Sequence, residues 1–179
     1  MQRCLWLQKY FKCTNIMDIK IACSKYSDFD DKVIYKASEL GLPLIGGTAL
    51  EVWANYFNVP GARKRSNNDL DFISNDLPQI NEFQSWVREN IDSSKVQVDV
   101  MHVQSHDFSE YIREVNGVLI MAPEYLLWSK LIRSDRSDKD LKDIKWLLTI
   151  EQMSDEDITY AFENLGVTDE EIELIKSLV

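Results

Sequence analysis

Residues 42–50 have the sequence LPLIGGTAL, in which a short apolar run ends at two adjacent glycines and a threonine. Pro43 near the start of the run suits the first residues of a strand, where its missing N–H weakens the sheet least. The two glycines then allow a tight turn and a close approach of the backbone to a ligand. We expect a strand that ends at Ile45, then the turn, and then a helix from Ala49 to about Phe57.

The turn at Gly46, Gly47 and Thr48 has the chemistry of a phosphate site. The helix that follows would present free N–H groups and the positive end of its dipole, both of which favour phosphate oxygens. The Thr48 hydroxyl would add a contact to the ligand or cap the helix. A plain tight turn explains these residues equally well when they are considered alone, so the prediction depends on a second motif.

That second motif is DLDF at residues 69–72. Asp69 and Asp71 are two residues apart on a predicted strand over 69–74, so both carboxylates project from the same face. Neighbouring carboxylates repel each other unless a cation lies between them, and oxygen ligands of this type suit Mg²⁺. A solvated edge strand with two chance acids is the alternative for this motif in isolation.

A third carboxylate belongs to the clearest predicted strand, at 95–103. Valines alternate there with polar residues, which places Asp99 on the polar face. If this strand pairs in register with the one at 69–74, three carboxylates share an open sheet face, where they would hold one or two metal ions and activate a hydroxyl. Considered alone, Asp99 is equally well explained as an exposed surface residue.

The rest of the pattern predicts an α+β fold in which a small mixed sheet packs on helices, followed by a C-terminal helical segment. The expected elements are helices at 30–40 and 78–91, a hairpin of strands 111–115 and 118–121 closed by Asn116 and Gly117, and helices from Pro123 onwards. The expected divisions are an N-terminal extension of unclear role at 1–27, a core at 28–121 and the helical segment at 122–179.

The formal net charge of −10 is concentrated near the C-terminal end. Residues 151–179 contain nine acidic residues and one lysine, so the rest of the chain is nearly neutral. Overall acidity disfavours a DNA duplex as a partner, without opposing a single RNA end or a small polar acceptor. Since no apolar run reaches the roughly 18–20 residues that span a bilayer, and the first residues lack a signal-peptide pattern, we expect a cytoplasmic protein with no membrane partner.

Together these motifs resemble the signature of the nucleotidyltransferases of the DNA polymerase β superfamily. The residues that carry the resemblance are Gly46-Gly47-Thr48-Ala49-Leu50, Arg65 and Asp69-Leu70-Asp71-Phe72. Within the superfamily the chain is most similar to the AbiEii-like branch, which includes the toxins of type IV toxin–antitoxin systems. A helical lysine, Lys130, followed by Lys139-Asp140 and Asp143-Ile144, indicates this branch.

The resemblance implies a Mg²⁺-dependent enzyme that moves a nucleoside monophosphate from an NTP to an acceptor hydroxyl and releases pyrophosphate. It implies phosphate contacts for Gly46, Gly47 and Thr48, metal binding for Asp69 and Asp71, and the role of base or third ligand for Asp99. It further implies that Lys130 contacts the triphosphate, that Asp143 orients this lysine or the loop beside it, and that Arg65 supports the acid pair or the nucleotide. The C-terminal helical segment would thus complete the active site.

The acceptor stays open at this stage. An RNA end, such as that of a tRNA, is favoured by the helical lysine motif, and a toxin would have an antitoxin protein as a further partner. A small-molecule adenylyltransferase, of the type that modifies aminoglycosides or lincosamides, is the main alternative because such enzymes have a similar length and glycine motif. A catalytically degenerate nucleotide-binding or regulatory domain on the same fold is the third hypothesis, and the retained aspartates and glycines argue against it.

Overall fold

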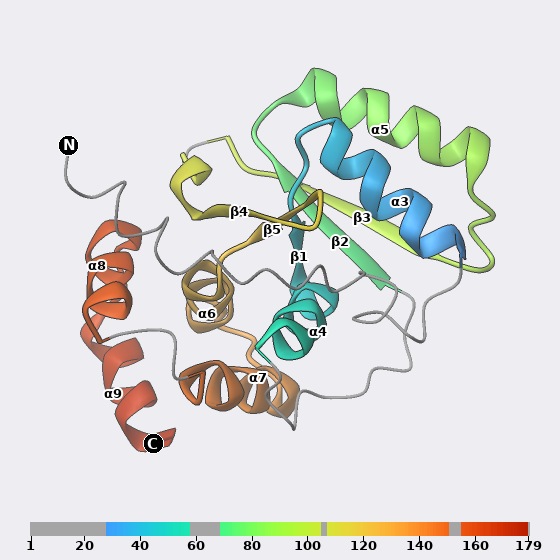
Figure 1. Ribbon diagram of the computed structural model, residues 1–179. Helices are drawn as coiled ribbons and strands as arrows, with labels where there is room; N and C mark the ends of the chain where they lie inside the picture. Colours follow the sequence, from blue (N-terminus) through green and yellow to red (C-terminus); the bar gives the residue numbers. More distant parts are fainter. Residues whose placement is uncertain (1–27, 58–68, 105–106, 151–154, 179) are drawn as a thin grey trace.

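A computed structural model of the chain describes residues 28–57, 69–104, 107–150 and 155–178 (Figure 1). The strands form one mixed sheet with the order β3-β2-β1-β5-β4. They are β1 (Leu44–Ile45), β2 (Asp69–Ser74), β3 (Gln97–His102), β4 (Ile112–Val115) and β5 (Val118–Met121). The predicted α+β class, with a small mixed sheet packed on helices, is confirmed.

Strand β2 lies inside the sheet, between β3 and β1. It runs parallel to β3 and antiparallel to β1, and β1 in turn runs parallel to β5. The hairpin of β4 and β5 closes through Asn116 and Gly117, whose φ angles of 53° and 78° are those of the two-residue turn that the sequence predicts. Strands β3 and β4 are therefore the two edges of this sheet.

Helices α3 (Asp28–Glu39) and α5 (Leu77–Asn90) pack on one face of the sheet and lie side by side in Figure 1. Leu70 and Phe72 of β2 are buried on this face, because alternate residues of a strand point to the same side. The ring of Phe72 meets that of Phe83 in α5 at a centroid distance of 5.3 Å. Leu70 and Phe72 thus fill the core on this side, and the two aspartates lie on the opposite face together with the buried Ile73.

Helix α4 (Gly46–Tyr56) begins directly after β1, at the first glycine and not at Ala49. The expected separate turn before the helix is therefore wrong. Gly46 has a φ of 68°, so this one residue redirects the chain and the first turn of the helix already contains both glycines. Further along α4, Trp53 is buried and its indole N–H donates to the carbonyl oxygen of Met121 at 2.8 Å, which fixes the helix to the end of β5.

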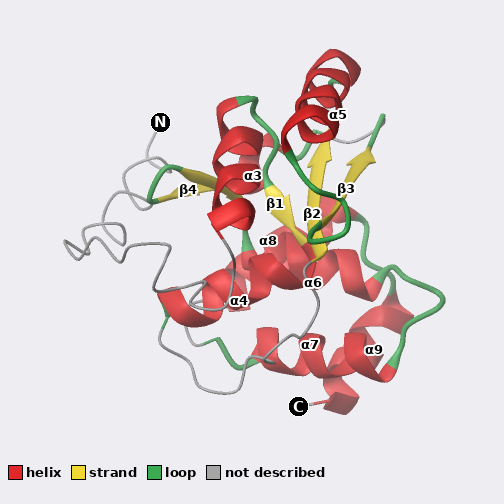
Figure 2. Cartoon of the chain, turned by 90° about the vertical axis from the view of Figure 1, so that its right-hand side faces the viewer, coloured by secondary structure: helices red, strands yellow, loops and turns green. Residues whose placement is uncertain are grey.

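Four further helices follow β5 in the part of the sequence that the structure describes, and the first of them packs on α4. Their bounds are α6 (Pro123–Leu131), α7 (Asp138–Leu148), α8 (Asp155–Leu165) and α9 (Asp169–Leu178). Helix α6 packs on α4, α7 and α8, and α7 packs on α9. Figure 2 shows α4, α6 and α7 together, on the side of the molecule away from α5. The indole N–H of Trp128 joins α6 to α8 by donating to the carbonyl oxygen of Leu165 at 2.9 Å.

Other differences from the expected elements are small. Strand β1 has two residues, and Tyr111 belongs to a 3₁₀ turn (Ser109–Tyr111) that precedes β4. The predicted extension at 1–27 and the residue Arg65 lie outside the described residues. Within the described ranges, none of the helices combines the length and the apolar character needed to cross a membrane.

Candidate active site

Three carboxylates occupy neighbouring positions on one face of the sheet. In the parallel pairing of β2 with β3, Asp71 lies opposite Asp99, and Asp69 lies opposite Gln97. Because registered neighbours of a sheet share a face, the side chains of Asp69, Asp71 and Asp99 project to the same side. We call these three residues the carboxylate face; Asp69 and Asp71 are half-buried, and Asp99 is exposed. The register that the sequence leaves open is the one that brings the three together.

The backbone of Gly46 lies directly against the Asp71 carboxylate. A β-carbon at Gly46 would overlap Oδ2 of Asp71 and would come within 3.0 Å of its Cγ. The positive φ of Gly46 adds a second reason for glycine, since residues with a side chain rarely adopt this conformation. The start of α4 and the carboxylate face therefore form one unit, with helix N–H groups beside an acidic side chain.

Thr48 ties the same helix to β2. Its Oγ1 donates to the carbonyl oxygen of Asp69 at 3.0 Å, and the residue has no exposed surface. The hydroxyl thus already has a partner inside the protein and helps to hold Asp69 beside α4. A phosphate contact from Thr48 stays a prediction. Thr48 and Asp69 are 21 residues apart in the sequence, which explains why sequence patterns do not reveal the hydrogen bond between them.

The donor atoms of the carboxylate face fit a divalent cation, but they do not form a closed cage. In the described part of the chain, no three histidine, cysteine or acidic side chains lie close enough together to hold a metal ion. Mg²⁺ in nucleotide sites usually takes one or two carboxylates and completes its shell with water and phosphate oxygens. Oxygen donors arranged side by side on one face therefore fit an ion that arrives with a nucleotide.

A second charged group lies where α6 meets α7. The Nζ atom of Lys130 is 2.9 Å from Oδ2 of Asp143 and 3.1 Å from Oδ1 of Asp140. We call these three residues the lysine cluster; their exposed fractions are 8 % for Lys130, 5 % for Asp143 and 4 % for Asp140. The pair of Lys130 with Asp143 is the one that the resemblance implies, whereas Asp140 is a partner that sequence reasoning missed.

Burial by itself would raise the pKa of Asp140, because it disfavours the charged carboxylate. Hydrogen bonds from the Ser137 hydroxyl at 2.7 Å and the Ser137 backbone N–H at 3.0 Å, together with Lys130, outweigh burial and hold the pKa of Asp140 well below its usual range. The bond from the Ser137 N–H to the Asp140 carboxylate and the bond from the Asp140 N–H to the Ser137 hydroxyl form a capping box at the start of α7. The spacing of Ser137 and Asp140 in the sequence is typical of this local partnership, whereas nothing in the sequence points to Lys130 as the second partner of Asp140.

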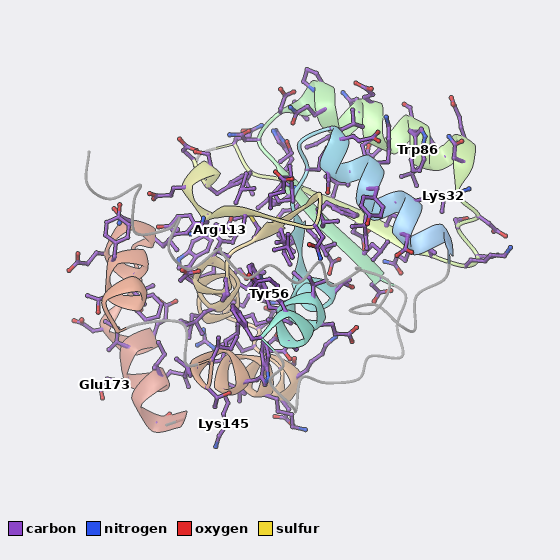
Figure 3. All side chains as sticks on the ribbon, in the orientation of Figure 1. Lys32, Tyr56, Trp86, Arg113, Lys145 and Glu173 are labelled. Carbon is purple, nitrogen blue, oxygen red and sulfur yellow. The ribbon has the colours of Figure 1, made fainter. Side chains whose placement is uncertain are left out.

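Gly47 is the remaining predicted phosphate-binding residue that the structure describes. Gly47 is buried in the first turn of α4, directly after Gly46. Lys145 of α7 and Glu173 of α9 are exposed and point away from the body of the molecule (Figure 3). Charges of this kind belong to the solvated surface and carry no argument for the site.

Comparison with known proteins identifies a fold. No family model matches the chain, and no curated protein matches it. Among solved structures, the crystal structure of the Megavirus polyadenylate synthase matches 83 % of this chain with a TM-score of 0.55 and 17 % sequence identity. The chain has a nucleotidyltransferase fold. It spans 36 % of the length of that polyadenylate synthase. The likeness concerns the fold and gives no support to the AbiEii-like branch.

Proposed function

We propose that this chain is a Mg²⁺-dependent nucleotidyltransferase that moves a nucleoside monophosphate from an NTP to an acceptor hydroxyl. The observation that carries the proposal is the position of Asp71, which lies opposite Asp99 on β3 and against Gly46 at the start of α4. This position joins carboxylates, which suit a divalent cation, to a helix N-terminus, which suits phosphate. The nucleotidyltransferase fold supports the same class, but unrelated functions share folds, so the argument depends on the site.

In this proposal the backbone N–H groups of the first turn of α4, at Gly46 and Gly47, bind phosphate oxygens of the NTP. Asp69 and Asp71 would hold the cation with their half-buried carboxylates. A bound Mg²⁺ ion supplies positive charge to the phosphates and lowers the pKa of the acceptor hydroxyl. Gly46 keeps the phosphate-binding turn and the metal-binding carboxylate in contact, because no side chain separates them.

The reaction is an in-line displacement at the α-phosphorus. The acceptor oxygen forms a new bond to this phosphorus while the bond from phosphorus to the bridging oxygen of the β-phosphate breaks, and its electron pair leaves with pyrophosphate. Asp99, the exposed member of the carboxylate face, accepts the proton of the acceptor hydroxyl. Positioning of the two substrates and electrostatic stabilisation account for most of the rate.

Lys130 is the proposed cation for the leaving pyrophosphate, with Asp143 as the residue that orients it. Two buried carboxylates already hold the ammonium group, and the Nη1 atom of Arg133 lies 4.0 Å from one of them, that of Asp140. A triphosphate would therefore have to replace at least one carboxylate at Lys130. The KM for NTP of Lys130→Arg tests this role. This variant keeps the positive charge between the two carboxylates, whereas a neutral residue would also destabilise the fold.

An RNA end is the acceptor that we favour. The structure whose fold the chain shares belongs to a polyadenylate synthase, which by its name makes a polymer of nucleotides. A toxin of the AbiEii-like branch is a finer form of this proposal, and the 2.9 Å pair of Lys130 with Asp143 favours it because the resemblance implies that pair. Growth arrest on expression, relieved by a neighbouring gene that encodes an antitoxin, would distinguish a toxin from a small-molecule transferase.

The test of the proposed function uses the purified chain with Mg²⁺, each α-³²P-labelled NTP in turn and total cellular RNA, beside Asp69→Asn. A discrete labelled RNA band with the wild type alone supports the proposal and identifies the base and the acceptor class. Binding of Mg²⁺ and NTP without labelled RNA directs the search to small-molecule acceptors such as aminoglycosides. A chain that binds no NTP contradicts the proposal and favours a degenerate domain.

A further inference from the structure

An amide completes the polar set around the carboxylate face. Gln97 and Asp99 are both exposed on the edge strand β3, where Gln97 lies opposite Asp69 and Asp99 lies opposite Asp71. The Nε2 atom of Gln97 donates to Oδ2 of Asp99 at 2.8 Å. Four neighbouring positions of β2 and β3 thus hold three carboxylates and one neutral donor, and the donor is hydrogen-bonded to the carboxylate that the proposed mechanism uses as its base.

The choice of an amide at this position has a physical reason. Like charges on directly opposite residues of neighbouring strands destabilise a sheet, and Asp71 and Asp99 already form such a pair. A fourth carboxylate opposite Asp69 would add repulsion, whereas glutamine is neutral and brings N–H donors that a carboxylate accepts. The bond between two exposed side chains contributes little to stability, so its main effect is on the orientation of Asp99.

We infer that Gln97 is a positioning residue for Asp99: its amide holds Oδ2 and so directs Oδ1 towards the acceptor hydroxyl. This inference rests on the proposed function, in which Asp99 accepts the proton of that hydroxyl. An exposed aspartate on an edge strand otherwise samples several rotamers, and only some of them point at the acceptor. Hydrogen-bond partners that orient the ligands of a metal site typically matter about 10- to 100-fold for activity without touching the substrate, and we expect an effect of this size here.

The test compares Gln97→Met, which keeps the length of the side chain but removes the donor, with Gln84→Met. Gln84 is an exposed glutamine on α5, which packs on the opposite face of the sheet, so the control makes the same chemical change away from the site. We expect Gln97→Met to lower the single-turnover rate of label transfer from α-³²P-labelled NTP to total RNA about 10- to 100-fold. The KM for NTP and the Tm stay at their wild-type values, and Gln84→Met transfers at the wild-type rate.

The same substitution in an Asp99→Asn background shows whether Gln97 acts through Asp99. If it does, Gln97→Met lowers the residual rate by less than about twofold there, because a positioning residue has no effect once its target is lost. A loss of the same size in both backgrounds overturns the inference. If methionine on the edge strand lowers the Tm, Gln97→Ala, which also lacks the donor, replaces Gln97→Met in both backgrounds.

The outcomes separate this inference from the proposed function. A wild type that transfers label and a Gln97→Met variant that matches it overturn the inference and leave the proposed function intact. A wild type that binds no NTP and labels no acceptor overturns both.

Discussion

The carboxylate face and the lysine cluster both contain aspartates, but in opposite surroundings. Asp69, Asp71 and Asp99 are half-buried or exposed on a sheet face, whereas the lysine cluster is at least nine-tenths buried between two helices. Buried charges persist only when they are paired, and the lysine cluster provides its own pairs at 2.9 and 3.1 Å. Adjacent carboxylates that reach the surface instead favour a cation from solution. Burial therefore separates two motifs that the sequence assigns to one site. The carboxylate face lies partly at the surface of the sheet, whereas the lysine cluster is buried and internally paired.

The largest expected effect is on stability, from Lys130→Met. This change leaves two buried carboxylates without their cation, for which we expect a loss of about 3–5 kcal/mol in the free energy of unfolding. Urea denaturation measures it. Lys142→Met is the matched control because Lys142 is exposed on α7, and its change should stay within about 0.5 kcal/mol. Equal losses of unfolding free energy in Lys130→Met and Lys142→Met would show that the ion pairs of the lysine cluster do not stabilise the fold.

The next effect is on activity, from Gly46→Ala. The new β-carbon would displace the Asp71 carboxylate, and a misplacement of this size costs about 100-fold in rate. Gly166→Ala is the matched control, since Gly166 has the same φ of 68° but nothing within 4 Å of the added atom. Both variants carry the same backbone strain, so the transfer rates per folded molecule compare the carboxylate contact alone. Similar rates for both would contradict the role of Gly46.

Thr48→Val probes the bond that joins α4 to β2. Valine has the shape of threonine but cannot donate, so the carbonyl oxygen of the half-buried Asp69 loses its hydroxyl partner, at a cost of about 1–3 kcal/mol in unfolding free energy. Thr149→Val is the control: the Thr149 hydroxyl also donates to a backbone carbonyl, that of Trp146 at 2.7 Å, but in an exposed position. Thermal and urea denaturation of both variants should give the larger loss at Thr48, and the opposite order would refute its structural role.

The smallest effect is a dependence of stability on pH that comes from Asp140. Its pKa is lower in the folded than in the unfolded chain, where an aspartate titrates at about 3.9. Its stabilising contribution is therefore complete above that value and is lost progressively as the pH falls from there towards the folded pKa. We expect Asp140→Asn to be less stable than the wild type at pH 6, by about 1 kcal/mol as for the loss of other capping interactions, and this difference to narrow by pH 3. Urea denaturation at both pH values measures the difference. If the difference in unfolding free energy between the wild type and Asp140→Asn became larger at pH 3 than at pH 6, the pKa of Asp140 would not be lowered by folding.

The sequence predicts the carboxylate face well because local rules place it. Alternation along a strand is a property of neighbouring residues, so the shared face of Asp69 and Asp71 and the polar position of Asp99 follow from the chain itself. Their arrangement side by side depends on the pairing of β2 with β3, which no local pattern specifies. The start of α4 is displaced from the expected Ala49 because Gly46 alone redirects the chain at positive φ.

Contacts between distant residues account for what the sequence does not reveal. The bond from Thr48 to Asp69 and that from Lys130 to Asp140 both depend on how helices pack, and neither pair has a characteristic spacing. Gln97 is a different case, since its alternation with Asp99 is visible in the sequence. An exposed glutamine is so common on strands that only its 2.8 Å hydrogen bond distinguishes it.

The most direct test of the central claim is the rate of label transfer from an α-³²P-labelled NTP by the wild type and by Asp71→Asn. Asp92→Asn serves as the control, since Asp92 is an exposed residue in the turn before β3. The account predicts a loss of at least about 100-fold for Asp71→Asn with an unchanged Tm, and a wild-type rate for Asp92→Asn. Equal transfer by the wild type and Asp71→Asn would contradict the assignment of the carboxylate face as the active site.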